Sequence, residues 1–362
     1  MPGPTTTPAE VFPAGEYLRD ELDERGWTIT EFAEIIGRPV QAVSEILNGK
    51  KEITTDTAIE FGQALGTSPE LWLNLQTKYR VWSQRRQHQP ESPIARRSRL
   101  RELLPLSEVR NRGWIHPTDD LDKAETEVCA LLELESISGT PRFLIAAKRT
   151  NHGDDLTLAQ SAWVGRVRQI ARARTVGAFD LRALEARAAQ LAYDLRDGPS
   201  TLAAVPKWFA ECGVSVVFLA GLRGGKLDGA VTVLETGTPV IGLTARGDRF
   251  DSLVFTLLHE CAHLTLGHVG TEGDRLLVDD DLTSPNDDPL EAAANAQAAA
   301  WIFPNGFDVS GTSSADLLDA SQRYGVHPSL VIGRVQHAKQ DFRIHRRQIP
   351  SVRQHLPLEG DG

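Results

Sequence analysis

Hydrophobic and polar positions along the first 85 residues repeat with the period of short helices. Over 16–25, Tyr17, Leu18 and Leu22 share one face of a helix that ends at Gly26. Further helices are predicted over 30–36, 39–47, 55–65 and 68–82, with Gly37 and Asn48-Gly49 as stops. The pattern therefore predicts a five-helix unit over residues 1–85.

The next stretch, 85–112, is basic, is interrupted by prolines and holds few large apolar residues before Leu103. We interpret 86–112 as a linker with a short helix at its end. Helical periodicity returns over 121–137 and 156–196, which are rich in Ala, Leu and Arg. This periodicity predicts a helical middle region over 113–200.

The pattern changes after residue 200. Alternating and β-branched runs predict strands over 214–219, 229–234 and 239–243, the last two joined by a turn at 235–238. A strongly apolar helical stretch follows over 253–266, and then an acidic loop and helices over 289–303, 314–324 and 328–338. The chain is therefore predicted to be mainly α with a small β-sheet, an α+β fold, with a C-terminal domain over 201–345 and a tail over 346–362.

Length and composition narrow the class of protein. A chain of 362 residues with 41% hydrophobic and 24% charged residues fits two or three soluble globular domains. There is no apolar run of about 18 residues and no basic, apolar leader at the N-terminus, so we expect a cytoplasmic protein without a membrane partner. Three scattered cysteines exclude a disulfide framework. The net charge of −10 means that nucleic-acid binding would rest on a local surface.

Residues 259–263 form an HExxH motif within the apolar helical stretch. Positions i and i+4 lie about 40° apart around a helix, so His259 and His263 point into one cleft. Glu260 stands beside them, where a carboxylate can take a proton from a metal-bound water. The spacing is typical of a zinc hydrolase and predicts Zn²⁺ as the cofactor.

A catalytic zinc needs a third protein ligand. On a continuous helix His268 would be turned about 140° away from His263, which excludes it. Glu291 is the preferred candidate: it lies 28 residues after His263 and precedes an alanine-rich run that allows close helix packing. Asn295, one turn on, is placed to orient a ligand. Because Asp288-Pro289-Leu290-Glu291 also reads as a capping box, the residues alone leave capping and ligation about even. The acidic patch 279–281 is interpreted as a solvated face.

Two segments carry a family resemblance. FTLLHECAHLTLGH, followed by LEAAANAQAAAWIFP, resembles the ImmA/IrrE metallopeptidases over roughly residues 200–340. The resemblance implies a zincin-like domain with zinc on His259, His263 and Glu291, Glu260 as general base, and metal-assisted peptide hydrolysis. Cys261-Ala262 and Gln297 depart from the family pattern and affect packing only. The candidates for stabilising the oxyanion, each with a structural role as the competing interpretation, are Tyr324, His327, Arg334 and His337.

Residues 30–47 have a helix–turn–helix layout. From residue 14 to about Tyr79 the chain resembles HigA-type antitoxins of the Xre class. The resemblance implies double-stranded operator DNA as a partner. Gln41, Ser44 and Glu45 would stand on the recognition helix, and Thr30, Lys50 and Lys51 would meet phosphates. The alternative is a helical bundle kept for protein contacts, because residues 1–90 hold 13 acidic and 9 basic residues, a net charge of −4.

Three functions follow from these features. The first is a DNA-binding regulator with a zinc metalloendopeptidase that cleaves a repressor, an antitoxin or itself. The second is a HigA-like antitoxin that represses its operon and neutralises a toxin, with the metal domain as a sensor. The third is a catalytically silent ligand-binding module, against which the retained Glu260 argues. The expected protein partners are a repressor, antitoxin or toxin, and a second copy of the chain in a homodimer.

Overall fold

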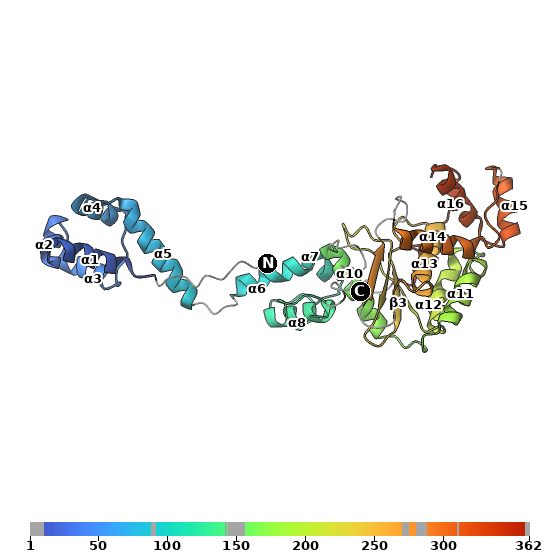
Figure 1. Ribbon diagram of the computed structural model, residues 1–362, viewed down its shortest axis with the longest axis horizontal. Coiled ribbons are helices and arrows are strands. Elements are labelled where there is room, and N and C mark those ends of the chain that lie inside the picture. The colour runs from blue at the N-terminus through green and yellow to red at the C-terminus, as the bar shows by residue number, and fades with distance from the viewer. Residues whose placement is uncertain are drawn as a thin grey trace. The chain divides into compact units, whose positions relative to one another are not determined.

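The computed structural model describes residues 11–87, 92–141, 143, 156–269, 275–279, 288–309 and 311–358. The chain divides into two compact units, residues 1–93 and 94–362 (Figure 1). It is mainly helical with one four-stranded sheet, which confirms the predicted α+β class. No helix in the described ranges is long and apolar enough to cross a membrane.

The N-terminal unit contains the five predicted helices: α1 (Ala14–Arg25), α2 (Ile29–Ile35), α3 (Val40–Leu47), α4 (Thr55–Leu65) and α5 (Pro69–Gln87). Its core is centred on aromatic rings. Phe61 makes edge contacts with Phe32 and Trp72, at centroid distances of 5.3 and 5.4 Å. The Trp72 indole N–H donates to Thr67 Oγ1 at 2.8 Å, so its one polar atom is satisfied within the core.

The C-terminal unit is built around a mixed sheet. Its strands are β1 (Ser215–Phe218), β2 (Gly229–Val233), β3 (Pro239–Leu243) and β4 (Arg275–Asp279), in the order β1-β3-β2-β4. β1 runs parallel to β3, and β2 is antiparallel to both β3 and β4. β4 occupies part of the predicted acidic loop, because Leu276 and Leu277 are buried against the two faces of the sheet. Asp280 and Asp281 lie outside the described residues.

Helices cover both faces of this sheet (Figure 1). Strand residues alternate between two cores: Val231 and Ile241 face α13 (Phe250–Thr265), whereas Ala230 and Val240 face α10 (Leu158–Arg172). The remaining helical elements of the unit are α6 (Pro93–Leu103), α7 (Leu106–Asn111), α8 (Leu121–Leu132), α11 (Leu181–Asp194), η1 (Pro199–Ala204), α12 (Val205–Ala210), α14 (Pro289–Ile302), α15 (Ser314–Tyr324), α16 (Pro328–Lys339) and η2 (Arg346–Gln348).

The structure differs from the predicted division of this part of the chain into a linker over 86–112 and a separate helical middle region over 113–200. From α6 onward the chain belongs to the C-terminal unit, because Leu100 and Leu104 are buried in the same core as the sheet. The basic side chain of Arg96 is bound by Glu125, at 2.6 Å, and does not extend into solvent. In α10, the fully buried Arg168 donates to the Val233 carbonyl of β2 at 2.8 Å. These helices therefore form one layer of the C-terminal unit.

The predicted tail 346–362 also joins the fold. Val352 and Leu356 are buried in the core that contains α13. Asp248, just before α13, accepts hydrogen bonds from the backbone N–H groups of Val352 and Arg353, both at 2.9 Å. The chain up to residue 358 therefore continues the C-terminal unit.

Candidate metal centre and helix–turn–helix surface

The HExxH motif lies on α13, the central helix of the C-terminal unit. This helix contacts β2 and β3 on one side and α11, α14 and α16 on the others. Its apolar residues face all these neighbours, which explains why the stretch is apolar without a polar stripe. His259, Glu260 and His263 are fully buried. Their side chains are therefore held by packing before any ligand is present.

Two imidazole nitrogens and one carboxylate converge at this helix. The Nε2 atoms of His259 and His263 are 2.8 Å apart. Glu291 Oε2 lies 3.1 Å from His259 Nε2, and its Oε1 lies 3.4 Å from His263 Nε2. Ligand atoms from all three residues lie within 4.8 Å of one another. The structure thus brings together the three residues that the sequence suggests as metal ligands.

Glu291 lies with the two histidines, and the cap of α14 is made by another residue. Asp288 caps α14, accepting a hydrogen bond from the Leu290 N–H at 2.8 Å. Ala294 and Ala298 are buried where α14 meets α13, so the two helices approach closely. Close approach is what allows a carboxylate in the first turn of α14 to reach both imidazoles.

Each histidine has a partner on its outer nitrogen. Asn295 Oδ1 lies 3.0 Å from His259 Nδ1, where an amide oxygen accepts a proton. A proton on Nδ1 leaves the lone pair of Nε2 directed into the cluster, the tautomer that binds a metal. On His263 the corresponding neighbour is His268, whose Nδ1 lies 3.0 Å from His263 Nδ1.

The position of His268 differs from the prediction, which assumed a continuous helix. α13 ends at Thr265, and Gly267 takes a left-handed conformation with φ of 73°. The His268 N–H then donates to the His263 carbonyl at 2.9 Å, which folds His268 back over His263. Burial lowers the pKa of His268, which favours a neutral ring at pH 7. The Gly267-His268 pair was the available sequence signal, since glycine commonly ends a helix.

The carboxylate of Glu260 lies against the sheet at a position where the strand has a glycine. A Cβ atom at Gly229, the first residue of β2, would lie 2.1 Å from Glu260 Oε1. Only a residue without a side chain lets the strand and the carboxylate share this space. Burial raises the pKa of the thiol of the next residue, Cys261, well above its usual value, which favours the neutral thiol.

The residues present fit zinc. Two imidazole nitrogens and one carboxylate oxygen form a donor set of catalytic zinc sites, which keep a fourth position for water. The acceptor at Asn295 and the carboxylate of Glu260 complete the surroundings that such a site requires.

The four residues that the sequence offers for stabilising the oxyanion are described by their contacts and their exposure. Tyr324 Oη accepts from the Asp308 N–H at 2.7 Å, and His327 caps α16 by accepting from the Ser329 N–H at 3.1 Å. Arg334 is exposed and lies over the ring of Phe307 at 5.8 Å, and His337 is exposed. The contacts of Tyr324, His327 and Arg334 are those of structural residues.

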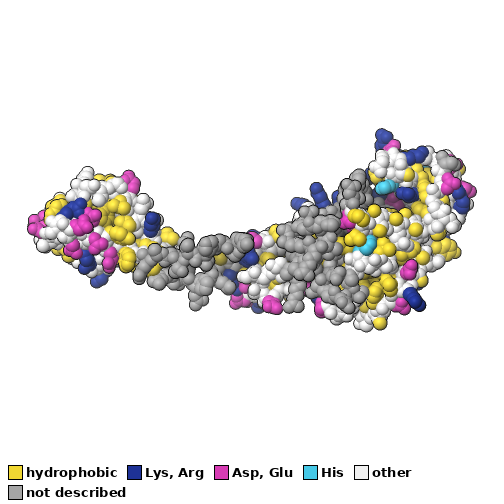
Figure 2. Space-filling view, viewed as in Figure 1, with side chains coloured by type: hydrophobic (Ala, Val, Ile, Leu, Met, Phe, Trp, Pro, Cys, Tyr) yellow, Lys and Arg dark blue, Asp and Glu magenta, His cyan; other side chains and the backbone are white. Residues whose placement is uncertain are grey.

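The predicted DNA contacts lie on and around α3. Gln41 is exposed, while Ser44 and Glu45 are half-buried on the same helix. Gln41 Nε2 donates to Glu45 Oε1 at 3.1 Å, and the Asn48 amide donates to the Ser44 carbonyl at 2.8 Å. The exposed residues at the flanks are Thr30, Lys50 and Lys51. Figure 2 shows acidic and basic side chains interspersed over this unit.

Comparison with known proteins identifies the N-terminal unit. The helix-turn-helix family matches residues 18–72. The HTH-type transcriptional regulator YddM of Escherichia coli is 35% identical over 69 residues, which are 19% of this chain and 70% of the relative. The chain belongs to the helix-turn-helix family.

Two further relatives are antitoxins. Antitoxin HigA-1 of Vibrio cholerae is 36% identical over 83 residues, 23% of this chain and 78% of the relative. A solved addiction module antidote protein of the HigA family from Coxiella burnetii is 36% identical, with 20% of this chain and 80% of that chain covered and a TM-score of 0.20. The cluster of His259, His263 and Glu291 lies outside residues 18–72, the part that the family matches.

Proposed function

We propose that this chain is a DNA-binding transcriptional regulator whose C-terminal unit is a zinc-dependent endopeptidase, which cleaves a repressor or antitoxin protein, or the chain itself. The observation that carries the proposal is the convergence of His259, His263 and Glu291 beside the buried carboxylate of Glu260. The resemblance to the ImmA/IrrE metallopeptidases supports the same assignment. The helix–turn–helix unit favours a regulatory protein as the substrate over nutrient peptides.

The chemistry follows from where each side chain stands. When bound, zinc polarises the scissile carbonyl and acidifies a water molecule. His259, His263 and Glu291 would hold the ion, and Asn295 and His268 orient the two imidazoles through their Nδ1 atoms. Glu260 takes the proton from the attacking water and passes it to the leaving amine. The lack of a side chain at Gly229 leaves room for that carboxylate beside the sheet.

Zinc analysis and cleavage assays on matched variants test this proposal. The full chain is incubated with the protein encoded beside it, with and without a chelator. Glu260→Gln should keep zinc and abolish cleavage, because the amide cannot take the proton. His263→Ala should lose both, and Glu185→Gln, at an exposed glutamate of α11, should lose neither. Unchanged cleavage by Glu260→Gln would contradict the peptidase assignment.

The second function is a HigA-like antitoxin with the metal domain as a sensor. It is favoured by the 36% identity to antitoxin HigA-1 over 83 residues. Under this alternative, zinc would change DNA binding or toxin binding, and the partner would stay intact. Removal of zinc by a chelator therefore separates the two: loss of cleavage supports the peptidase, and altered binding without cleavage supports the sensor.

A further inference from the structure

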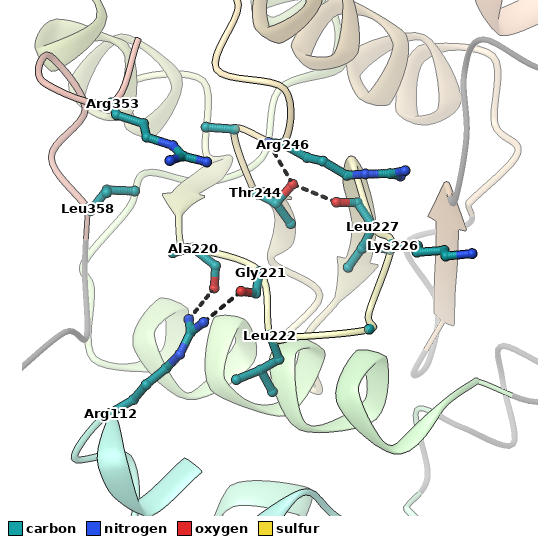
Figure 3. A pocket seen from close by; sticks show the side chains of 12 residues that line it. Arg112, Ala220, Gly221, Leu222, Lys226, Leu227, Thr244, Arg246, Arg353 and Leu358 are labelled. Carbon is teal, nitrogen blue, oxygen red and sulfur yellow. Dashed lines mark hydrogen bonds between the residues drawn. The ribbon is translucent and has the colours of Figure 1, made fainter. Parts of the chain in front are cut away.

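A cavity lies in the C-terminal unit where the parallel strands β1 and β3 end (Figure 3). It has a volume of about 550 Å³. Its walls include Ala220 and Gly221 after β1, and Thr244 to Arg246 after β3. In sheets with parallel strands, ligands commonly bind in a crevice at the carboxyl ends of the strands. None of the residues of the metal cluster lines this cavity.

Among the described residues that line the cavity, every ionisable side chain is basic. Arg112, Lys226, Arg246 and Arg353 come from four separate segments, in a chain with a net charge of −10. Two of these side chains already have partners. Arg112 donates to backbone carbonyls, and a guanidinium nitrogen of Arg246 lies 3.6 Å from a carboxylate oxygen of Asp228. Within the described residues, no carboxylate lies within ion-pair distance of Lys226 or Arg353; the nearest acidic influence on Arg353 is Asp248, which accepts its backbone N–H and whose pKa the Arg353 charge helps to lower. The rim therefore presents two cations to solvent.

The cavity walls are fixed by hydrogen bonds. The Arg112 guanidinium donates to the carbonyls of Ala220 and Gly221, both at 2.7 Å (Figure 3). Thr244 Oγ1 donates to the Leu227 carbonyl at 2.6 Å. These bonds connect the end of α7 with the segment after β1, and the end of β3 with the segment before β2, so the shape of the cavity does not depend on a ligand.

The lining backbone is also unusual. Lys226 and Ala245 are held in the left-handed region, with φ of 42° and 54°, where residues other than glycine are uncommon. Such conformations persist where the surrounding structure imposes them, and they cluster at binding sites. Beneath the cations the floor is apolar, with Leu222, Leu227 and Ala245 buried.

We propose that this cavity binds a small organic anion. Its apolar body would lie against Leu222 and Leu227, and its carboxylate or phosphate against the cationic rim, to which Arg353 and Lys226 contribute from opposite sides (Figure 3). A cation-lined rim over an apolar floor selects ligands that carry both features, since a bare anion gains nothing from the floor and a neutral ligand nothing from the rim. The cavity would be a ligand-binding site that shares no residues with the candidate metal centre, and this proposal does not depend on the proposed peptidase activity.

Dye binding to the full chain tests the charge requirement. The probe is 8-anilinonaphthalene-1-sulfonate, which joins one anionic group to an apolar ring system, and its uncharged counterpart is N-phenyl-1-naphthylamine. Lys226→Gln with Arg353→Gln should weaken binding of the sulfonate up to about fivefold, because one exposed ion pair contributes a factor of up to about five. Binding of the uncharged dye should not change. Lys339→Gln with Arg347→Gln, two exposed cations elsewhere in the unit, is the matched control.

A size variant tests the cavity without changing charge. A Cβ at Gly221 would meet Thr244 Cγ2 at 3.5 Å, an ordinary contact, so Gly221→Ala should fold and still bind. Gly221→Leu extends the same side chain into the cavity and should abolish binding of the sulfonate. Octanoate and phenyl phosphate then compete for the site, and the stronger competitor identifies the head group. Sulfonate binding that is equal in wild type, the double charge variant and Gly221→Leu would overturn the proposal, as would failure of both competitors.

Discussion

Gly229→Ala tests the contact between β2 and the proposed general base. The added Cβ would lie 2.1 Å from Glu260 Oε1 and 2.8 Å from Thr256 Cγ2, well inside normal contact distance. Neither partner moves easily, because β2 is paired on both sides and α13 is buried. Overpacking of this kind costs about 1–3 kcal/mol. We expect the free energy of unfolding to fall by that amount, measured by equilibrium urea unfolding followed by circular dichroism.

A double-mutant cycle attributes this cost to Glu260. Glu260→Ala removes Oε1 and Cδ from the position of the new Cβ and leaves the contact with Thr256. Gly229→Ala should therefore cost less in the Glu260→Ala background, with a coupling of about 1 kcal/mol. Because the assay measures stability, it needs no knowledge of the substrate.

Gly242→Ala is the matched control for this cycle. Its Cβ would lie 2.6 Å from Trp163 Cη2 of α10, on the opposite face of the sheet from α13. It should destabilise the unit by a similar amount, and its effect should add to that of Glu260→Ala within about 0.5 kcal/mol. Equal costs of Gly229→Ala in both backgrounds would refute the close contact between Gly229 and Glu260.

Three further predictions concern the metal centre, the DNA-binding surface and pH. Asn295→Ala should lower zinc affinity about 10–100-fold in a chelator competition, whereas Asn295→Asp, which keeps an acceptor for His259, should retain it; equal affinities would contradict the orienting role. Lys50→Gln with Lys51→Gln should reduce the salt slope of binding to the DNA upstream of the gene by about two, and no retardation of that DNA by wild type at low salt would contradict DNA binding. The Arg172 hydrogen bond lowers the pKa of Glu235 to about 2, so the stability that this pair contributes is present above the ordinary carboxyl pKa and is lost as the pH falls towards 2. Wild type should exceed Glu235→Gln in stability by up to about 1 kcal/mol at neutral pH and converge with it in acid, and a constant difference in urea unfolding across that range would exclude the pair.

The sequence predicted local structure well where one residue decides it. Gly37, for example, has φ of 67° and stands between α2 and α3, where the apolar pattern breaks. Helix geometry alone was enough to predict that the two histidines of the HExxH motif point to the same place. Glu291 was harder, because a carboxylate in the first turn of a helix suits a cap as well as a metal, and only the packing of α14 on α13 separates the two.

Other features depend on contacts that no local pattern carries. β4 is short and lies among acidic residues, and its leucines are buried only because β2 provides a pairing edge. α6 is rich in arginine, and its place in the core follows from the burial of Leu100, which a single apolar residue in a basic stretch does not predict. The residues that line the cavity come from four separate segments of the sequence, so no local sequence motif predicts the cavity.

The burial of Glu260 has an evolutionary consequence. A glutamine is nearly the same size as a glutamate, so it can occupy the space against Gly229 while His259, His263, Glu291 and Asn295 keep their places. Codons for the two amino acids differ at a single base. Under the proposed function, a regulator that cuts its partner and one that only senses metal therefore differ by one base change at codon 260, which requires no refolding of the unit.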